Sequence, residues 1–297
     1  DADGRKRLPT PFWPQDHVAL PARPENKMSF TLCLNTSTIK PQPMLEKIRL
    51  TAEAGFEAIE LWINDIYEFV GQGGEVRDIE QALADQGLPV VSMIAARAWG
   101  EAIEVEYPII LDEVKRRLEL CARFGCPWLV CSPPRQSCDL DQITRRYKDI
   151  LELGRPLGVK PTFEYISFFG SVFQLKQAWQ VVEQINDPDA TLILDAFHSW
   201  NSKSTLDELR HIPGDRISHY HIDDAHPNIP ATKQMDPDRV MIGEGVIDLP
   251  SEIQVLREIG YQGAISLELF NQQLWSQDPS EVLRIGIDRM RALLADT

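Results

Sequence analysis

The chain is poor in cysteine and has no long hydrophobic run, and each shortage excludes a class of protein. Its 297 residues include five cysteines with no C-x-x-C pair. This pattern predicts reduced, mostly buried thiols instead of a disulfide framework or a cysteine-rich zinc site. No apolar run reaches the roughly 18 residues of a transmembrane helix. The first residues lack the charged-then-apolar organisation of a signal peptide. We expect a cytoplasmic protein; because the chain starts at Asp1, removal of an export signal stays open.

Positive charge is also scarce. Lys and Arg number 30 against 45 Asp and Glu, which gives a formal net charge of -15. Such a surface repels both a phosphate backbone and an anionic membrane. We therefore expect neither a nucleic-acid nor a membrane partner. Hydrophobic residues make up 43% of the chain, which is ordinary for a globular protein and excludes disorder over the whole length.

A strand-plus-helix unit recurs along the chain. Amphipathic stretches end in a glycine that is followed by a short apolar run, as at Gly55, Gly87, Gly125, Gly158 and Gly260. Glycine suits the left-handed position just past a helix end. Short, nearly all-apolar runs are typical of parallel strands buried on both faces.

Counting these runs predicts eight strands. They lie at 29–35, 58–64, 89–95, 127–132, 160–166, 190–195, 217–222 and 264–270. Eight units in this length indicate an α/β protein with a (β/α)8 TIM barrel as one domain, residues 28–297. The alternative is a doubly wound open sheet, but no G-x-G-x-x-G follows the first strand. Residues 1–27 are proline-rich and non-periodic, and are predicted to form an extended N-terminal arm.

Polar residues gather where four successive strands end. These residues are Glu164, Asp195, His221 and Glu268. A carboxylate inside an apolar strand is costly unless it is paired or metal-bound. Three carboxylates and one imidazole suit a divalent cation, with Mn²⁺ favoured and Co²⁺, Zn²⁺ or Mg²⁺ as alternatives. His219 points the same way as His221 but lies deeper, so we expect a structural role for it.

A long loop follows the seventh strand, at about 223–248. Loops of this length in compact domains are usually functional. Arg239 in this loop is a candidate substrate clamp, with an ion pair to Asp236 or Asp238 as the alternative. Asp223 and Asp224 could both cap the loop, and Asp223 is the favoured candidate.

Several stretches resemble a known family. They are LCLNTST at 32–38, GFEAIEL at 55–61, LILDAFH at 192–198, and the run from YHIDD at 220–224 through DRVMIGEGVIDL to GYQGAISLELF at 260–270. Together they resemble the xylose isomerase-like TIM barrels, the sugar phosphate isomerase/epimerase group, over about residues 28–295. Asp223 stands where many members have Lys, which favours an inosose-isomerase-like branch.

The resemblance implies specific roles. One divalent metal ion would be held by Glu164, Asp195, His221 and Glu268. Substrate would be contacted by His198, Arg239 and Glu60. The expected reaction is isomerisation or epimerisation of a keto-sugar or keto-inositol through a metal-stabilised enediolate, with Glu164 and Glu268 exchanging the proton. The stretch 94–107 matches nothing familiar and is expected to line the pocket. The partner would be a small polyol or keto-sugar, and family members are often dimers or tetramers.

Three other functions are weighed beside this one. A lyase on the same metal site, such as an inosose or dehydroshikimate dehydratase or a β-eliminating deglycosidase, is the runner-up. An endonuclease at abasic DNA sites would need histidines from early strands, yet none lies between His17 and His198. A non-catalytic sugar-binding barrel is disfavoured by the intact ligand set.

Overall fold

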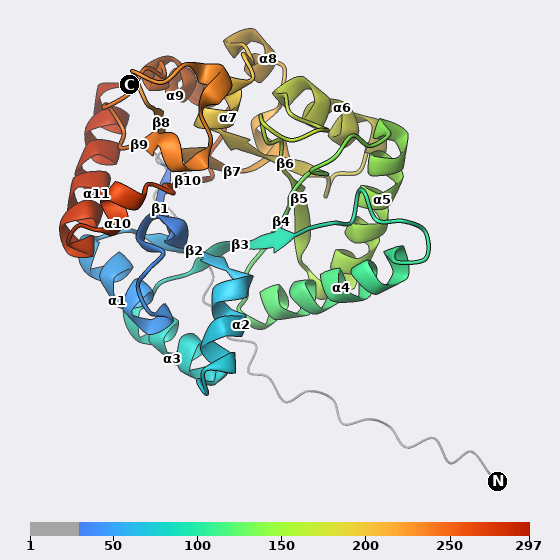
Figure 1. The fold of residues 1–297 in the computed structure, drawn as a ribbon, viewed down its shortest axis with the longest axis horizontal. Coiled ribbons are helices and arrows are strands. Elements are labelled where there is room, and N and C mark those ends of the chain that lie inside the picture. Colours follow the sequence, from blue (N-terminus) through green and yellow to red (C-terminus); the bar gives the residue numbers. More distant parts are fainter. Residues whose placement is uncertain (1–29) are drawn as a thin grey trace.

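The computed structural model describes residues 30–297, which form a closed barrel of parallel strands (Figure 1). The predicted arm at 1–27 lies outside the described residues. The barrel strands are β1 (Thr31–Asn35), β2 (Ala58–Trp62), β3 (Val90–Ala96), β4 (Trp128–Cys131), β5 (Lys160–Phe163), β6 (Thr191–Asp195), β7 (Ile217–Ile222) and β10 (Ala264–Leu267). Their order around the barrel is β1-β10-β7-β6-β5-β4-β3-β2. All eight predicted strands are confirmed, and the open-sheet alternative is wrong.

Helices follow the strands and surround the barrel (Figure 1). They are α1 (Met44–Ala54), α2 (Ile63–Gly71), α3 (Val76–Gln86), α4 (Tyr107–Arg123), α5 (Leu140–Gly154), α6 (Leu175–Ile185), α7 (Ala196–Asn201), α8 (Leu206–Arg210), α9 (Leu249–Glu258), α10 (Gln272–Trp275) and α11 (Pro279–Asp296). In α4 the buried residues Val114, Leu118 and Cys121 recur at helical spacing, as the sequence predicts. Glycine ends α3 as expected, because Gly87 has φ +60° and donates its N–H to the carbonyl of Ala84.

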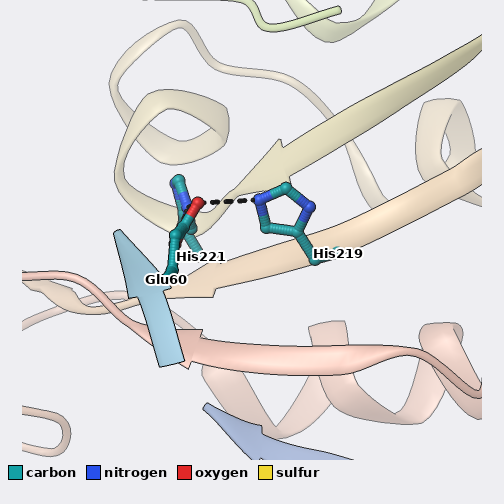
Figure 2. A group of neighbouring side chains, drawn as sticks. All are labelled: Glu60, His219 and His221. Atoms are coloured by element: carbon teal, nitrogen blue, oxygen red, sulfur yellow. Dashed lines mark hydrogen bonds and ion pairs between the residues drawn. The ribbon is translucent and has the colours of Figure 1, made fainter. Parts of the chain in front are cut away.

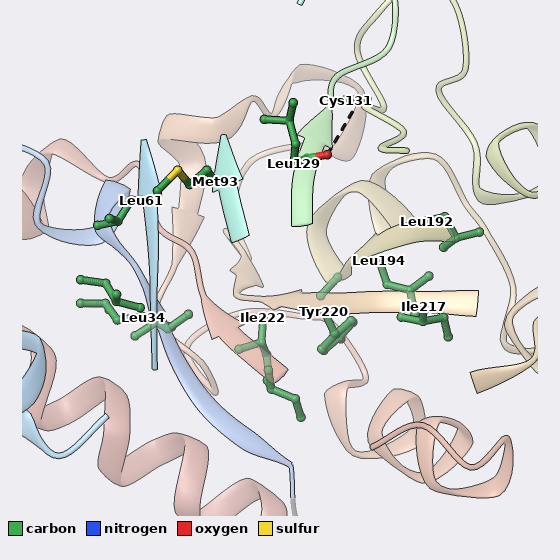
Figure 3. Close-up of a cluster of buried hydrophobic side chains, with 14 of the residues drawn as sticks. Leu34, Leu61, Met93, Leu129, Cys131, Leu192, Leu194, Ile217, Tyr220 and Ile222 are labelled. Atoms are coloured by element: carbon green, nitrogen blue, oxygen red, sulfur yellow. Dashed lines mark hydrogen bonds between the residues drawn. The ribbon is translucent and has the colours of Figure 1, made fainter. Parts of the chain in front are cut away.

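Strand residues alternate between an apolar outer layer and a polar interior. Side chains such as Leu34, Leu61 and Leu194 join the hydrophobic cluster between barrel and helices (Figure 3). Burying each such side chain stabilises the fold by about 1.5–3 kcal/mol. Glu60 and His221, in contrast, hydrogen-bond each other across the barrel. The interior therefore holds functional polar groups beside apolar side chains such as those of Val130 and Ile193, whereas branched apolar side chains usually fill these barrels.

The predicted loop at 223–248 contains a small hairpin above the barrel. Strand β8 (Asp224–Ala225) pairs antiparallel with β9 (Arg239–Val240). Asp224 fixes the return of the loop, since its carboxylate accepts the backbone N–H groups of Gly243 and Gly245 at 3.1 and 3.0 Å. Asp224, and not the expected Asp223, is the residue that caps this loop.

The structure also bears on the cysteines and on membrane crossing. All five cysteines are free; four are buried and Cys138 is partly buried. Reduced thiols were expected, and burial raises the pKa of Cys33 and Cys131 above the ordinary thiol value. Within residues 30–297, no helix combines the length and apolar character that crossing a membrane requires.

Candidate active site

The four predicted metal ligands lie at the carboxyl-terminal ends of neighbouring barrel strands. Glu164 directly follows β5, Asp195 ends β6, His221 is the penultimate residue of β7, and Glu268 directly follows β10. Three of them converge, because ligand atoms of Asp195, His221 and Glu268 lie within 4.8 Å of one another. Glu164 stands outside this group of three but faces the same end of the barrel. These ends are where catalytic residues of this fold gather.

His221 holds the cluster together because its two ring nitrogens face different carboxylates. Nδ1 lies 3.1 Å from Oε2 of Glu268 and 3.7 Å from Oδ2 of Asp195, without a hydrogen-bond partner. Nε2 lies 2.8 Å from Oε2 of Glu60 (Figure 2). Burial would lower the pKa of His221, but the charges of Glu268 and Glu60 raise it well above the usual value.

Glu60 is completely buried, and both oxygens of its carboxylate have hydrogen-bond partners. Its carboxylate accepts hydrogen bonds from Asn35, Ser92 and Ser266 at 2.8, 2.5 and 3.0 Å. Nε2 of His219 lies 3.0 Å from the same carboxylate (Figure 2). Burial opposes ionisation, yet the charges of His221 and His219 lower the pKa of Glu60 well below its usual value. The structure places Glu60, for which the family resemblance implies a contact with substrate, next to Nε2 of His221 in the barrel interior.

Among the described residues, the carboxylate of Glu164 has a single hydrogen-bond partner. Ser132 donates to its Oε2 at 3.1 Å. Burial, followed by the negative charge of Glu268, raises the pKa of Glu164 to about 8. The pKa of Glu268 is also raised, chiefly by burial, although His221 opposes the shift. Two buried carboxyl groups with raised pKa values are the kind of groups that accept and return protons near neutral pH.

Arg239 reaches from β9 into the carboxylate cluster. Its Nη1 lies 2.8 Å from Asp195 and 3.2 Å from Glu268, and it also donates to Asp223. Its Nη2 donates to Asp236 at 2.9 Å. The expected ion pair with Asp236 is therefore present. The guanidinium also neutralises carboxylates inside the barrel mouth, where unpaired charge is costly.

His198 follows the end of β6 and contacts Arg239, so it helps to orient the guanidinium. It lies three residues after Asp195, whose Oδ1 accepts the His198 backbone N–H at 2.7 Å. Its Nε2 lies 3.1 Å from Nη2 of Arg239, and Nδ1 lies 3.1 Å from Oγ of Ser167. Burial lowers the pKa of His198, so the imidazole is neutral near pH 7 and can accept a hydrogen bond from Arg239 or from a bound hydroxyl.

The cluster fits a divalent cation on its own chemistry. The Nδ1 atom of His221 is buried and forms no hydrogen bond within residues 30–297, while it faces the carboxylates of Asp195 and Glu268. Carboxylate oxygens with one imidazole nitrogen form a donor set that Mn²⁺, Co²⁺ and Zn²⁺ accept. The hydrogen bond from Nε2 to a carboxylate is the usual support of a metal-binding histidine.

Sequence reasoning missed the polar interior beneath the cluster. Asn35 was not singled out, yet its Nδ2 donates at 2.8 Å to both Glu60 and Glu268. The signal was present in the run AIELW, because a glutamate between apolar strand residues needs a partner in the same way as Glu164.

Comparisons with known proteins agree with the barrel fold. The family model described as xylose isomerase-like TIM barrel matches residues 48–293. The inosose isomerase of Bacillus velezensis is 24% identical over 89% of this chain and 97% of its own length. The 3-dehydroshikimate dehydratase of Pseudomonas putida is 27% identical over 76% of this chain and 36% of its own length. A solved structure of the IOLI protein with a binding zinc atom has a TM-score of 0.83 and 25% identity, covering 90% of this chain and 99% of that chain.

The relatives are named isomerases, epimerases and dehydratases. The zinc-binding relative and the carboxylate–imidazole cluster together support a divalent-metal site. Because the family model covers most of the sequence and the barrel is closed, the chain belongs to the xylose isomerase-like TIM barrel family of enzymes.

Proposed function

We propose that the protein is a divalent-metal-dependent isomerase or epimerase of a keto-sugar or keto-inositol. The observation that carries this proposal is the placement of two glutamates. Glu164 follows β5 and Glu268 follows β10, and the strands β6 and β7 lie between them in the barrel. The two glutamates therefore flank Asp195 and His221 along the rim.

The metal would be held by Asp195, His221 and Glu268, with Glu164 as the fourth ligand that the family resemblance implies. When bound, a divalent cation supplies Lewis-acid polarisation of a ketone and its neighbouring hydroxyl. We favour Mn²⁺ because the donors are mainly carboxylates.

The side chains divide the proton transfer between them. One glutamate removes the proton from the carbon next to the ketone, and the other returns a proton from the opposite side. The raised pKa of Glu164, about 8, keeps it basic enough for this task once it is ionised. Return to the same carbon gives epimerisation, and return to the neighbouring carbon moves the ketone.

His198 and Arg239 are proposed to bind substrate oxygens. His198 is neutral and can accept a hydroxyl hydrogen bond, whereas Arg239 donates from a guanidinium held by Asp236 and Asp195. Both residues contact each other, so a substrate hydroxyl placed between them would be oriented from two directions.

Deuterium exchange tests the proposal. The Mn²⁺-loaded protein is incubated in D₂O with inososes, ketohexoses and keto-polyols that carry a carboxylate, and uptake of deuterium next to the ketone is followed by NMR. We expect uptake with at least one substrate, and its loss in Glu268→Gln and Glu164→Gln. Glu258→Gln, on the exposed face of α9, is the matched control and should exchange normally. A metal-loaded protein that exchanges no proton in any of these ketones would contradict the proposal.

A dehydratase is the second candidate, and the Pseudomonas putida relative favours it. The same proton removal followed by loss of a β-hydroxyl as water would give an unsaturated ketone from an inosose and, after tautomerisation, an aromatic product from 3-dehydroshikimate, which is already an unsaturated ketone. Ultraviolet absorbance of these products, measured with 3-dehydroshikimate and inososes, separates this outcome from isomerisation.

A further inference from the structure

A cavity opens at the barrel mouth beside the ligand cluster. Its volume is about 270 Å³, and its lining includes Lys40, Trp62, Asp65, Glu68, Arg97 and Phe270. Trp62 ends β2, and the other residues come from the segments that follow β1, β2, β3 and β10. Arg97 also belongs to the stretch 94–107, which was expected to line the pocket and which the family resemblance does not explain.

The cavity carries excess positive charge in a strongly acidic protein. The charged side-chain groups of Arg97 and Lys40 form no ion pair or hydrogen bond with any residue of the described part, and each lies over an aromatic ring. Asp65 is neutralised by Lys47 at 2.6 Å. Glu68 accepts a hydrogen bond from the uncharged amide of Gln72. Two unpaired cations against one unpaired carboxylate leave a net positive charge, although the whole chain carries -15.

An aromatic wall connects this cavity with the ligand cluster. The guanidinium of Arg97 lies 5.4 Å from the ring centre of Trp62, and Trp62 meets Phe270 edge to face at 5.7 Å. Arg239 lies over the same Phe270 ring at 5.5 Å. Two packed rings, Trp62 and Phe270, thus lie between Arg97 and Arg239.

A hydrogen-bond chain makes the same connection. Nε1 of Trp62 donates to Asn35 at 2.8 Å, and Nδ2 of Asn35 donates to Glu268 at 2.8 Å. The platform on which Arg97 stacks is therefore fixed relative to a proposed metal ligand. The pKa of Arg97 is lowered by the surrounding protein, and the charge of Glu164 opposes this shift, so the guanidinium lies within electrostatic reach of the cluster.

We propose that this cavity is an anion subsite in which Arg97, assisted by Lys40, binds a carboxylate of the substrate while the ketone end lies at the ligand cluster. The proposal rests on the proposed function and narrows its substrate class to keto-polyols that carry one carboxylate. A guanidinium fork matches a carboxylate with two parallel hydrogen bonds. A monoanion is favoured over a phosphate dianion because Glu68 opposes a second negative charge.

Binding of compounds that cannot react tests the subsite without requiring turnover. The Mn²⁺-loaded full chain is titrated calorimetrically with shikimate, myo-inositol and myo-inositol 1-phosphate, which offer a carboxylate, no charge and a phosphate. We expect shikimate to bind about 10- to 100-fold more tightly than myo-inositol, the range for one charge-assisted bidentate pair. Arg97→Ala should abolish this preference and leave myo-inositol binding unchanged.

Arg77→Ala is the matched control, since this exposed arginine on α3 pairs with Glu75 outside the barrel mouth. It removes one positive charge and should preserve the shikimate preference. A preference that survives Arg97→Ala would mean that another group takes the carboxylate, and it would overturn the proposal. Tighter binding of the phosphate would overturn the assignment to a carboxylate.

The proposed reaction and the proposed anion subsite can be rejected independently of each other. Deuterium exchange on neutral ketoses without a shikimate preference would reject the subsite and keep the proposed function. A shikimate preference that depends on Arg97, without exchange on any ketone, would keep the subsite and reject the proposed reaction.

Discussion

Nε2 of His221 lies 2.8 Å from Oε2 of Glu60, and this contact turns the other ring nitrogen toward Asp195 and Glu268. Glu60 thereby acts on the proposed metal through His221 and is a positioning residue. Its own hydrogen bonds to Asn35, Ser92 and Ser266 fix the carboxylate.

Glu60→Gln should weaken metal binding while the fold is kept. An amide offers one oxygen acceptor in place of two, so the tautomer and orientation of His221 are held less firmly. Loss of such a supporting group costs about 10- to 100-fold in metal affinity. Calorimetric titration with Mn²⁺ and the visible spectrum of the Co²⁺-loaded protein measure this effect. Glu53→Gln, on the exposed face of α1, is the control, and an unchanged affinity in Glu60→Gln would reject the positioning role.

Arg239→Ala should destabilise the metal-free protein strongly. Asp195, Asp223 and Glu268 would lose their shared buried counter-charge. Removal of one partner from a buried ion pair costs about 3–5 kcal/mol in the free energy of unfolding. Urea denaturation measures the loss, and saturating Mn²⁺ should recover part of it because a bound cation supplies positive charge at the same carboxylates.

Arg284→Ala is the control for that substitution. Arg284 also pairs with two acids, Glu281 and Asp288, but all three side chains are exposed. Its removal should leave the free energy of unfolding nearly unchanged, because exposed ion pairs contribute little to stability. Equal effects of the two substitutions, or no effect of Mn²⁺ on Arg239→Ala, would contradict the described charge balance.

Glu252 should make stability fall with rising pH. Burial raises its pKa to about 8 from the ordinary 4.5, although the hydrogen bond from Tyr220 opposes the shift. The native state therefore keeps a proton that the unfolded chain releases above pH 4.5. The free energy of unfolding should decline between about pH 4.5 and 8 and level off above.

Glu252→Gln tests this pH dependence. The uncharged side chain can still accept the Tyr220 hydrogen bond, so the variant should match the parent near pH 4.5 and exceed it near pH 8, by about 1 kcal/mol or more. Urea denaturation at both pH values measures the difference. Glu258→Gln, two turns further along α9, should leave the pH profile unchanged, and parallel profiles for parent and Glu252→Gln would refute the prediction.

Gly245→Ala should loosen the hairpin loop. A Cβ atom at this position would lie 2.2 Å from Oδ1 of Asp224, the residue whose carboxylate binds the loop backbone. We expect a loss of about 1–3 kcal/mol of stability and faster proteolysis within residues 226–246. Gly71→Ala, in open space at the end of α2, is the control and should be neutral or slightly stabilising. Equal protease resistance of both variants would contradict this role for Asp224.

Sequence patterns predicted the barrel well because the signals for its strands and helices lie within short stretches of sequence. Helix-ending glycines and apolar runs recur within each unit, and strand ends bring Asp195, His221 and Glu268 to one rim. The placement of Glu60 and Asn35 could not be predicted in the same way. Their partners lie across the barrel interior, so their roles depend on strand register and side-chain direction. The loop cap was favoured at Asp223 and is found at Asp224. Neighbouring residues of an extended segment point to opposite sides, and the sequence does not show which side faces the loop.

Strand β7 places His219 and His221 toward the barrel interior and Tyr220 among the outer apolar side chains. A slip of this strand by one residue would exchange the two faces and put a phenol where the imidazoles belong. Metal uptake therefore reports whether β7 has found its correct register. In refolding experiments, recovery of metal binding should mark the closing of the barrel. The shortfall in bound metal per chain should then measure the fraction of chains in which β7 has the wrong register.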